Sequence, residues 1–335
     1  MKPEILFWLF LLFTGGLILA IPHISPRGLF FAVRTGTDFR TSETGRAALR
    51  LYNRAIYISL AVGALCIVVF GAERKPGLLA AASMLPEVAG LAAFLRNYFH
   101  LRPHAAPQEG VREADLLPAH DHLPWWTVFA LPPFLLPAGV LAYLHAHFDE
   151  IPLRYPVHFG ANGEPNRWAT RTAMGVDAPL LFTFGLVLLL LFLGAATFYG
   201  ARRSRNRSTV LAVMIGVTYL LSLIFSGVGL SPLMRYPLWA AWASIGLTAL
   251  LVVAVLCLAY WRSKDPAQPP DTTPDECWTL GGVYNNPKDP ALFVPKRIGW
   301  GYTFNFGNRW TWVVIGIFAA GIAGLTGFMA WAAQR

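Results

Sequence analysis

Histidine and acidic side chains gather between residues 145 and 164, and their chemistry suits a metal ion: His145, His147, Asp149, Glu150, His158 and Glu164. Imidazole and carboxylate groups are good ligands for zinc or copper. The spacing fixes no geometry, because residues two apart lie on different faces of a helix and no HExxH motif is present. His158 is therefore open to three interpretations: a hydrogen-bonding residue of a hairpin, a contact point for an extracellular ligand, or a metal ligand together with His145 and Glu164.

Glu87 lies near the middle of an apolar segment, directly after Pro86. A charge at the centre of a membrane helix costs roughly 2.5–3.5 kcal/mol on insertion scales, so such residues commonly serve an ion or proton pathway. The alternative is a structural, hydrogen-bonded glutamate that satisfies backbone carbonyls freed by Pro86. No second acidic residue lies deep in another apolar segment, which weakens the hypothesis of an ion-coupled transporter.

No nucleophile or cofactor motif accompanies these residues. The sequence lacks GxSxG, a P-loop and a Rossmann fingerprint. Cys66, Cys257 and Cys277 have no near partner in the sequence, which argues against a disulfide framework or a cysteine-based zinc site. The sequence therefore favours a protein that is not an enzyme and holds no cofactor. A membrane-embedded metalloenzyme built on the histidines and glutamates above is the alternative.

Long apolar segments surround the histidine and acidic residues described above and must hold them in place. Of the 335 residues 55% are hydrophobic and only 13% are charged, against about 25% charged in soluble domains. A membrane helix needs about 20 apolar residues, and eight segments qualify: 5–22, 55–71 (continuing upstream as a helix into 42–54), 76–95, 124–144, 178–200, 208–230, 238–261 and 310–333. The sequence predicts an all-α integral membrane protein with about eight transmembrane helices, whose first partner is the lipid bilayer.

The basic residues predict the direction of these spans. The loops 23–54, 96–123, 201–207 and 262–309 hold 19 of the 27 Lys and Arg residues, and cytoplasmic loops carry such an excess. We therefore expect these four loops in the cytoplasm and both termini outside. The net charge of +9 needs no nucleic-acid partner, because the basic residues form no single face.

Five arginines lie close before the second span: Arg34, Arg40, Arg46, Arg50 and Arg54. Basic residues at this position contact anionic lipid headgroups. A specific ligand or partner site is the second interpretation of the same residues.

The loop 147–177 predicts a compact hairpin that faces outward. A continuous helix is excluded by three prolines, Pro152, Pro156 and Pro165. Asn162-Gly163 is a strong tight-turn pair. Residues 155–159 are expected to be extended before this turn, and residues 164–168 to return toward the membrane.

Seven residues of this loop form the pattern P-x-H-F-x-x-x-G-E-P-x-x-W: Pro156, His158, Phe159, Gly163, Glu164, Pro165 and Trp168. Over residues 124–170 the chain resembles a short membrane-associated domain of unknown function that is common in bacteria. The same domain occurs near the start of SdpI-type immunity proteins, which protect a cell against a membrane-acting peptide toxin. The resemblance implies a bacterial cytoplasmic (inner) membrane protein with a contact surface for an extracellular peptide or small ligand. The rest of the chain does not resemble the C-terminal half of those immunity proteins.

Residues 276–309 carry a second pattern, W-x-x-G-x-x-Y-x-N-P-x-D-P followed by F-V-P-K-R. It resembles a short C-terminal domain that often accompanies the first one. Aromatic residues alternate from Trp300 to Phe306, which is typical of a half-buried strand. Another strand is expected at 291–297, after a turn at 285–290. The sequence predicts a small cytoplasmic β unit behind a flexible linker at 262–275.

These patterns divide the chain into an N-terminal membrane region with three helices and a basic loop (1–123), a helix-loop-helix unit with the outward hairpin (124–200), a two-helix region (201–261), the linker and β unit (262–309) and a final helix (310–335). Sensing or immunity at the outer membrane face is the favoured function. A small ion-coupled transporter using Glu87 is the main alternative.

Overall fold

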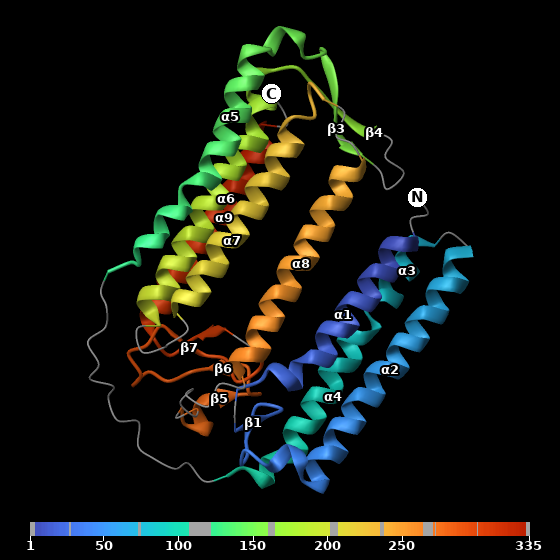
Figure 1. Cartoon of the computed structure of the whole chain (residues 1–335), viewed down its shortest axis with the longest axis vertical. Coiled ribbons are helices and arrows are strands. Elements are labelled where there is room, and N and C mark those ends of the chain that lie inside the picture. Colours follow the sequence, from blue (N-terminus) through green and yellow to red (C-terminus); the bar gives the residue numbers. More distant parts are fainter. Residues whose placement is uncertain are drawn as a thin grey trace. The chain divides into compact units, whose positions relative to one another are not determined.

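The computed structural model describes residues 4–26, 28–72, 75–106, 122–159, 165–201, 207–234, 238–263, 271, 273–299 and 301–332 (Figure 1). The α-helices of these residues are α1 (Glu4–Ile24), α2 (Glu43–Ala72), α3 (Pro76–Ser83), α4 (Leu85–Leu101), α5 (Pro132–Ala146), α6 (Ala173–Gly200), α7 (Arg207–Gly229), α8 (Leu238–Ser263) and α9 (Arg309–Ala332). The strands pair in two-stranded hairpins: β1 (Leu29–Phe30) with β2 (Val33–Arg34), β3 (Arg154–Phe159) with β4 (Pro165–Thr170), β5 (Trp278–Thr279) with β6 (Val283–Tyr284), and β7 (Phe293–Pro295) with β8 (Tyr302–Phe304).

Seven helical segments of the described residues are long and apolar enough to cross a membrane: Ile5–Ile24, Glu43–Gly71, Gly77–His104, Trp125–Ala146, Ala173–Gly200, Arg207–Gly229 and Arg309–Ala332. The chain is therefore a multi-pass membrane protein. The remaining predicted span corresponds to α8, whose apolar stretch Ala243–Leu258 is shorter. The count of eight spans stays a prediction.

The chain folds as two compact units. The first contains residues 1–114, 256–286 and 295–303, and the second contains residues 115–255, 287–294 and 304–335. The boundary between them crosses α8 and the β7–β8 hairpin.

In the first unit α1, α2, α3 and α4 pack together, and the third span is broken. The sequence predicts one helix over 76–95, but α3 ends at Ser83 and α4 runs from Leu85 to Leu101. Pro86 is the reason, because its ring and missing N–H prevent a helix from continuing through it. Glu87 therefore lies in the first turn of α4.

The β1–β2 hairpin is buried at one end of this bundle, where Figure 1 shows β1 beside the ends of α1, α2 and α4. Phe31 is fully buried and lies edge-on to Tyr52 and Phe94, with ring centroids 5.2 and 5.6 Å away. Phe31 and Ala32 have φ of 45° and 62°, which residues with a side chain rarely adopt. The sequence made no prediction for residues 29–33, which are all buried, and the side chains of residues 30–33 pack in the aromatic core.

In the second unit α5, α6, α7 and α9 lie side by side (Figure 1). Glycines allow α6 and α9 to approach closely, since a Cβ at Gly321 would lie 2.7 Å from Leu189 Cδ1, and one at Gly185 would overlap Leu325. Small residues at such contacts are typical of membrane helices.

Prolines inside the membrane helices free backbone carbonyls, and hydroxyl groups of neighbouring helices bind them. Pro22 has no N–H for the carbonyl oxygen of Ile18, which instead accepts from Tyr52 Oη at 2.9 Å. Pro137 likewise frees the carbonyl of Pro133, which accepts from Ser222 Oγ of α7 at 2.7 Å. Without water in the bilayer core, such carbonyls need a partner from the protein.

One turn away, Tyr219 of α7 donates to the carbonyl of Phe129 at 2.8 Å. Residues 132 and 133 are both proline and offer no N–H to this carbonyl. A hydroxyl group of α7 therefore donates twice to a carbonyl that a proline leaves without its helix hydrogen bond. These two hydrogen bonds fix the register of α5 and α7.

The C-terminal strands match the prediction in part. A strand was expected over 291–297, and β7 covers Phe293–Pro295; the alternating aromatics contain β8 at Tyr302–Phe304. The β5–β6 hairpin was not predicted, because its two-residue strands are too short to show a period of two.

Candidate functional site

The hairpin predicted from its prolines and Asn-Gly pair forms between α5 and α6. β3 and β4 are antiparallel, with Tyr155 opposite Ala169 and Pro156 opposite Trp168. Beyond Pro156 the register shifts at His158, and such bulges bend a ladder and increase its twist. The predicted extended segment and returning strand are confirmed.

Arg171, directly after β4, ties the hairpin to the end of α5. Its Nη1 donates to the carbonyl oxygens of Phe148, Asp149 and Ile151 at 3.3, 2.9 and 3.0 Å. The guanidinium also lies 5.5 Å from the centre of the Phe148 ring. Cations suit carbonyls left unpaired at a helix C-terminus. Thr172 then caps α6 by accepting from the N–H of Gly175 at 3.0 Å, so both ends of the hairpin are fixed.

The inner face of the hairpin packs on the helices through Tyr155. This side chain is fully buried with Leu144, Ile151 and Val176, and its hydroxyl has no hydrogen-bond partner. Burial raises the pKa of the Tyr155 phenol, and the negative charge of Asp177 raises it further. The sequence placed residues 155–159 in an extended segment, but it gave no reason to single out Tyr155.

His145 is paired with Asp177 at 3.0 Å, while His147 Nδ1 lies 2.9 Å from the carbonyl oxygen of Tyr143. The two imidazoles thus diverge, as expected from their spacing. Within the described ranges no three His, Cys, Asp or Glu residues are grouped to hold a metal. The structure describes only the backbone of His158, and Glu164 lies outside the described residues, so the metal hypothesis stays a prediction.

The outer face of the hairpin exposes apolar and basic side chains together. Trp168 is 50% exposed, and Leu153 and Val157 of the same hairpin segment are also exposed. Arg154 and Arg167 add two positive charges. Large exposed apolar side chains next to charges suit contact with a membrane-active ligand or with the lipid interface.

The other residues of the predicted contact surface are placed only in part. His158 and Phe159 pair through their backbones with Arg167 and Pro165. Gly163, like Glu164, lies outside the described residues.

Glu87 is the buried acid that the sequence singled out in the membrane. Both of its carboxyl oxygens are buried and have no hydrogen-bond partner among the described residues. The structural interpretation, in which Glu87 satisfies carbonyls freed by Pro86, is therefore wrong. An unpaired buried carboxyl group is costly and is a functional candidate.

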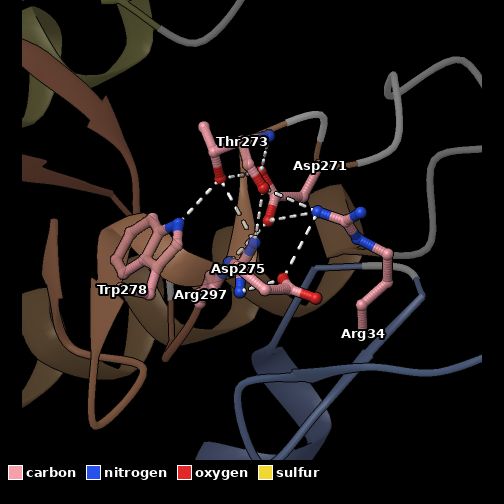
Figure 2. A network of polar contacts seen from close by, with 6 residues as sticks. All are labelled: Arg34, Asp271, Thr273, Asp275, Trp278 and Arg297. Atoms are coloured by element: carbon pink, nitrogen blue, oxygen red, sulfur yellow. Dashed lines mark hydrogen bonds and ion pairs between the residues drawn. The ribbon is translucent and has the colours of Figure 1, made fainter. Parts of the chain in front are cut away.

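Figure 2 shows a polar network that the sequence did not predict. Arg297 is 3% exposed, and its Nε and Nη1 contact Asp271 Oδ2 at 2.6 Å and Asp275 Oδ1 at 2.7 Å. Its Nη2 donates to the carbonyl of Thr273 at 2.7 Å, and its guanidinium lies 4.9 Å from the centre of the Trp278 ring. One guanidinium that contacts two carboxylates and a carbonyl while stacking on an indole ring suits arginine and not lysine.

Arg34 of β2 reaches the same network, donating to the carbonyl of Thr273 at 2.6 Å and lying 3.5 Å from Asp275 Oδ1. Two guanidinium and two carboxylate groups balance in charge, and the network contains no reactive nucleophile. Its role is structural: it fastens residues 271–275 to the β1–β2 hairpin. These residues are too far apart in the sequence for any local spacing to reveal them.

The geometry thus defines a multi-pass membrane protein in which the strands of a β-hairpin are fixed to the ends of two helices. Two family models match it. Residues 134–183, which include the β3–β4 hairpin, match a domain of unknown function (DUF1648), and residues 287–312 match a family of unknown function (DUF5808). No curated protein and no solved structure matches the chain. Both predicted resemblances to domains of unknown function are supported at this level.

Proposed function

We propose that the chain crosses a bacterial inner membrane eight times, with both termini outside. Arg34 contacts Asp271 and Asp275, so the segments that carry them lie on one side of the membrane. Five candidate spans separate these residues if α8 is left out. An odd number of crossings would put Arg34 and its two aspartate partners on opposite sides of the membrane. Their contact therefore supports a sixth crossing, by α8.

Two other contacts agree with this topology. Leu233, after α7, packs in the cluster of Leu144 and Tyr155, so the loop after α7 is on the side of the β3–β4 hairpin. Gly200, at the end of α6, contacts Phe293, which is on the side of the C-terminal strands. The excess of basic residues makes the latter side cytoplasmic and the hairpin extracytoplasmic.

On this topology the protein is a non-enzymatic sensor or immunity-like protein, and the β3–β4 hairpin is its contact surface for an extracellular peptide or small ligand. The observation that carries this proposal is the contrast between the two faces of one hairpin. Tyr155 and Arg171 fix the inner face to two membrane helices, while Trp168 and its neighbours stay exposed on the outer face. A preorganised exposed surface binds at lower entropic cost than a mobile loop. The SdpI-type resemblance suggests a membrane-active peptide as the ligand.

The test is survival of a sensitive bacterial host challenged with a panel of membrane-active peptides. Wild type is expected to protect, whereas Trp168→Ala and His158→Ala lose protection at equal expression. Truncating an exposed aromatic anchor at an interface commonly costs 2 kcal/mol or more, which corresponds to about thirty-fold in the protective peptide concentration.

Trp125→Ala is the matched control. Trp125 is 81% exposed and lies just before α5, at the end of this helix remote from the hairpin. It should protect like wild type. The immunity proposal fails if wild type protects against no peptide, or if Trp125→Ala abolishes protection as fully as Trp168→Ala.

A small ion-coupled transporter is the second candidate, and the unpaired carboxyl group of Glu87 favours it. In proteoliposomes Glu87→Gln should abolish any proton or cation flux that wild type supports. Flux that is equal in both proteins would remove this candidate.

A further inference from the structure

The five arginines before the second span separate into two groups in the structure. Arg34 belongs to the network of Asp271 and Asp275. Arg40 donates to the carbonyl of Leu29 at 3.2 Å and lies 5.4 Å from the centre of the Phe30 ring. These two arginines hold the β1–β2 hairpin and are not available to an external ligand.

The other three arginines, Arg46, Arg50 and Arg54, are exposed. Among the described residues, no ion pair or hydrogen bond of these three side chains is found. They follow one another at four-residue spacing on α2, which places them along one face of the helix. Three unpaired charges on one helix face repel one another, so an anionic ligand would stabilise them.

The opposite face of α2 is buried by Tyr52 and Ile56, which pack in the first unit's core. The arginine face is therefore turned away from the bundle. Because α2 is a candidate span from Glu43 to Gly71, the arginines occupy its first turns, and the same face continues into the apolar part of the span.

An open groove of about 500 Å³ lies on this face. It is lined by Arg50, Asn53, Arg54, Tyr57, Ile58 and Ala61. One end is therefore basic and polar, and the other end is apolar. Tyr57 and Ile58 are more than half exposed at 59% and 52%. From Arg54 to Ala61 the helix rises about 10 Å, so the groove passes from charged to apolar over the depth of a lipid headgroup and the start of its acyl chains.

We propose that this groove binds an anionic phospholipid, with the phosphate between Arg50 and Arg54 and the acyl chains along Ile58 and Ala61. Guanidinium groups pair bidentately with phosphate oxygens. A soluble anion would leave the apolar half of the groove without a partner. The site differs from general attraction of basic loops to the membrane, because its basic end and its apolar end follow each other along one face of α2, so it should hold one lipid and select its headgroup.

Native mass spectrometry of the delipidated full-length protein tests the proposal. Phosphatidylglycerol and phosphatidylethanolamine with the same acyl chains are added to wild type and to Arg50→Gln/Arg54→Gln. Wild type should retain phosphatidylglycerol in preference to phosphatidylethanolamine. Each arginine near the headgroups is expected to contribute about fivefold to the affinity, so the double variant should bind phosphatidylglycerol about twenty-five-fold more weakly.

Arg96→Gln/Arg102→Gln is the matched control, because both arginines are exposed, lie at α4 and its C-terminal end, and line no part of the groove. This variant removes the same charge and should bind like wild type. Millimolar inorganic phosphate should not displace the lipid. The proposal is overturned if both double variants lose binding equally, if neither loses it, if the two lipids bind alike, or if phosphate alone competes.

Discussion

Ser222→Ala should destabilise the protein because the serine hydroxyl replaces a helix hydrogen bond that Pro137 cannot make. Ser222 is 1% exposed, and its Oγ lies 2.7 Å from the carbonyl oxygen of Pro133. Leaving a buried acceptor unpaired costs about 1–3 kcal/mol, and hydrogen bonds between membrane helices reach about 1.7 kcal/mol. The expected loss is therefore about 1–2 kcal/mol, which corresponds to roughly 2–6 °C in Tm.

The assay is thermal unfolding in detergent micelles, followed by tryptophan fluorescence. Pro137→Ala restores an N–H that can donate to the Pro133 carbonyl. In that background Ser222→Ala should cost about 1 kcal/mol less than in wild type, as a double-mutant cycle measures.

Ser226→Ala provides the control. Ser226 is also buried on α7, one turn further, but its hydroxyl has no hydrogen-bond partner. Removing it should leave Tm unchanged or raise it slightly. Equal losses for Ser222→Ala and Ser226→Ala, or no coupling between Ser222 and Pro137, would refute the argument about freed carbonyls.

Two further predictions concern charged groups. Arg297→Met leaves Asp271 and Asp275 without their closest cation, and breaking a buried pair costs 3–5 kcal/mol. Because these carboxylates are 16% and 44% exposed, we expect a loss of about 3 kcal/mol of stability, at the lower end of that range. It should be measured as a lower Tm and as faster proteolysis near residue 275. Unchanged proteolysis would contradict the structural role of the network. Glu87→Met removes an unpaired buried carboxyl group and should raise stability by about 1–3 kcal/mol, whereas a lower Tm would mean that the carboxyl group has partners.

Local chemistry made parts of this structure predictable from the sequence. Apolar length predicted the helices, and prolines with Asn162-Gly163 predicted the β3–β4 hairpin. Pro86 was recognised as a source of free carbonyls, but Glu87 was the wrong partner for them. A proline in a helix leaves the carbonyl four residues earlier without its hydrogen bond, so the sequence identifies the carbonyls freed by Pro22 and Pro137. It does not identify the helix that supplies the hydroxyl group, because that depends on how the helices pack.

The buried tip of the β1–β2 hairpin was beyond such rules. Its apolar run from Leu29 to Val33 is too short for a span, and Phe31 with a positive φ breaks the usual turn preferences. Tertiary burial decided this conformation. The network of Arg297 was missed for the related reason that its charges come from distant loops.

The bond between Arg34 and Thr273 joins residues 239 positions apart, which has a consequence for biosynthesis. At about 5–20 residues per second, a ribosome needs roughly 12–48 seconds to make the chain between them. During that interval the N-terminal helices are already made, while the partner of Arg34 does not yet exist. Until then the first unit lacks the contacts of Arg34 with Asp271, Thr273 and Asp275. A chain truncated before residue 271 would never form them.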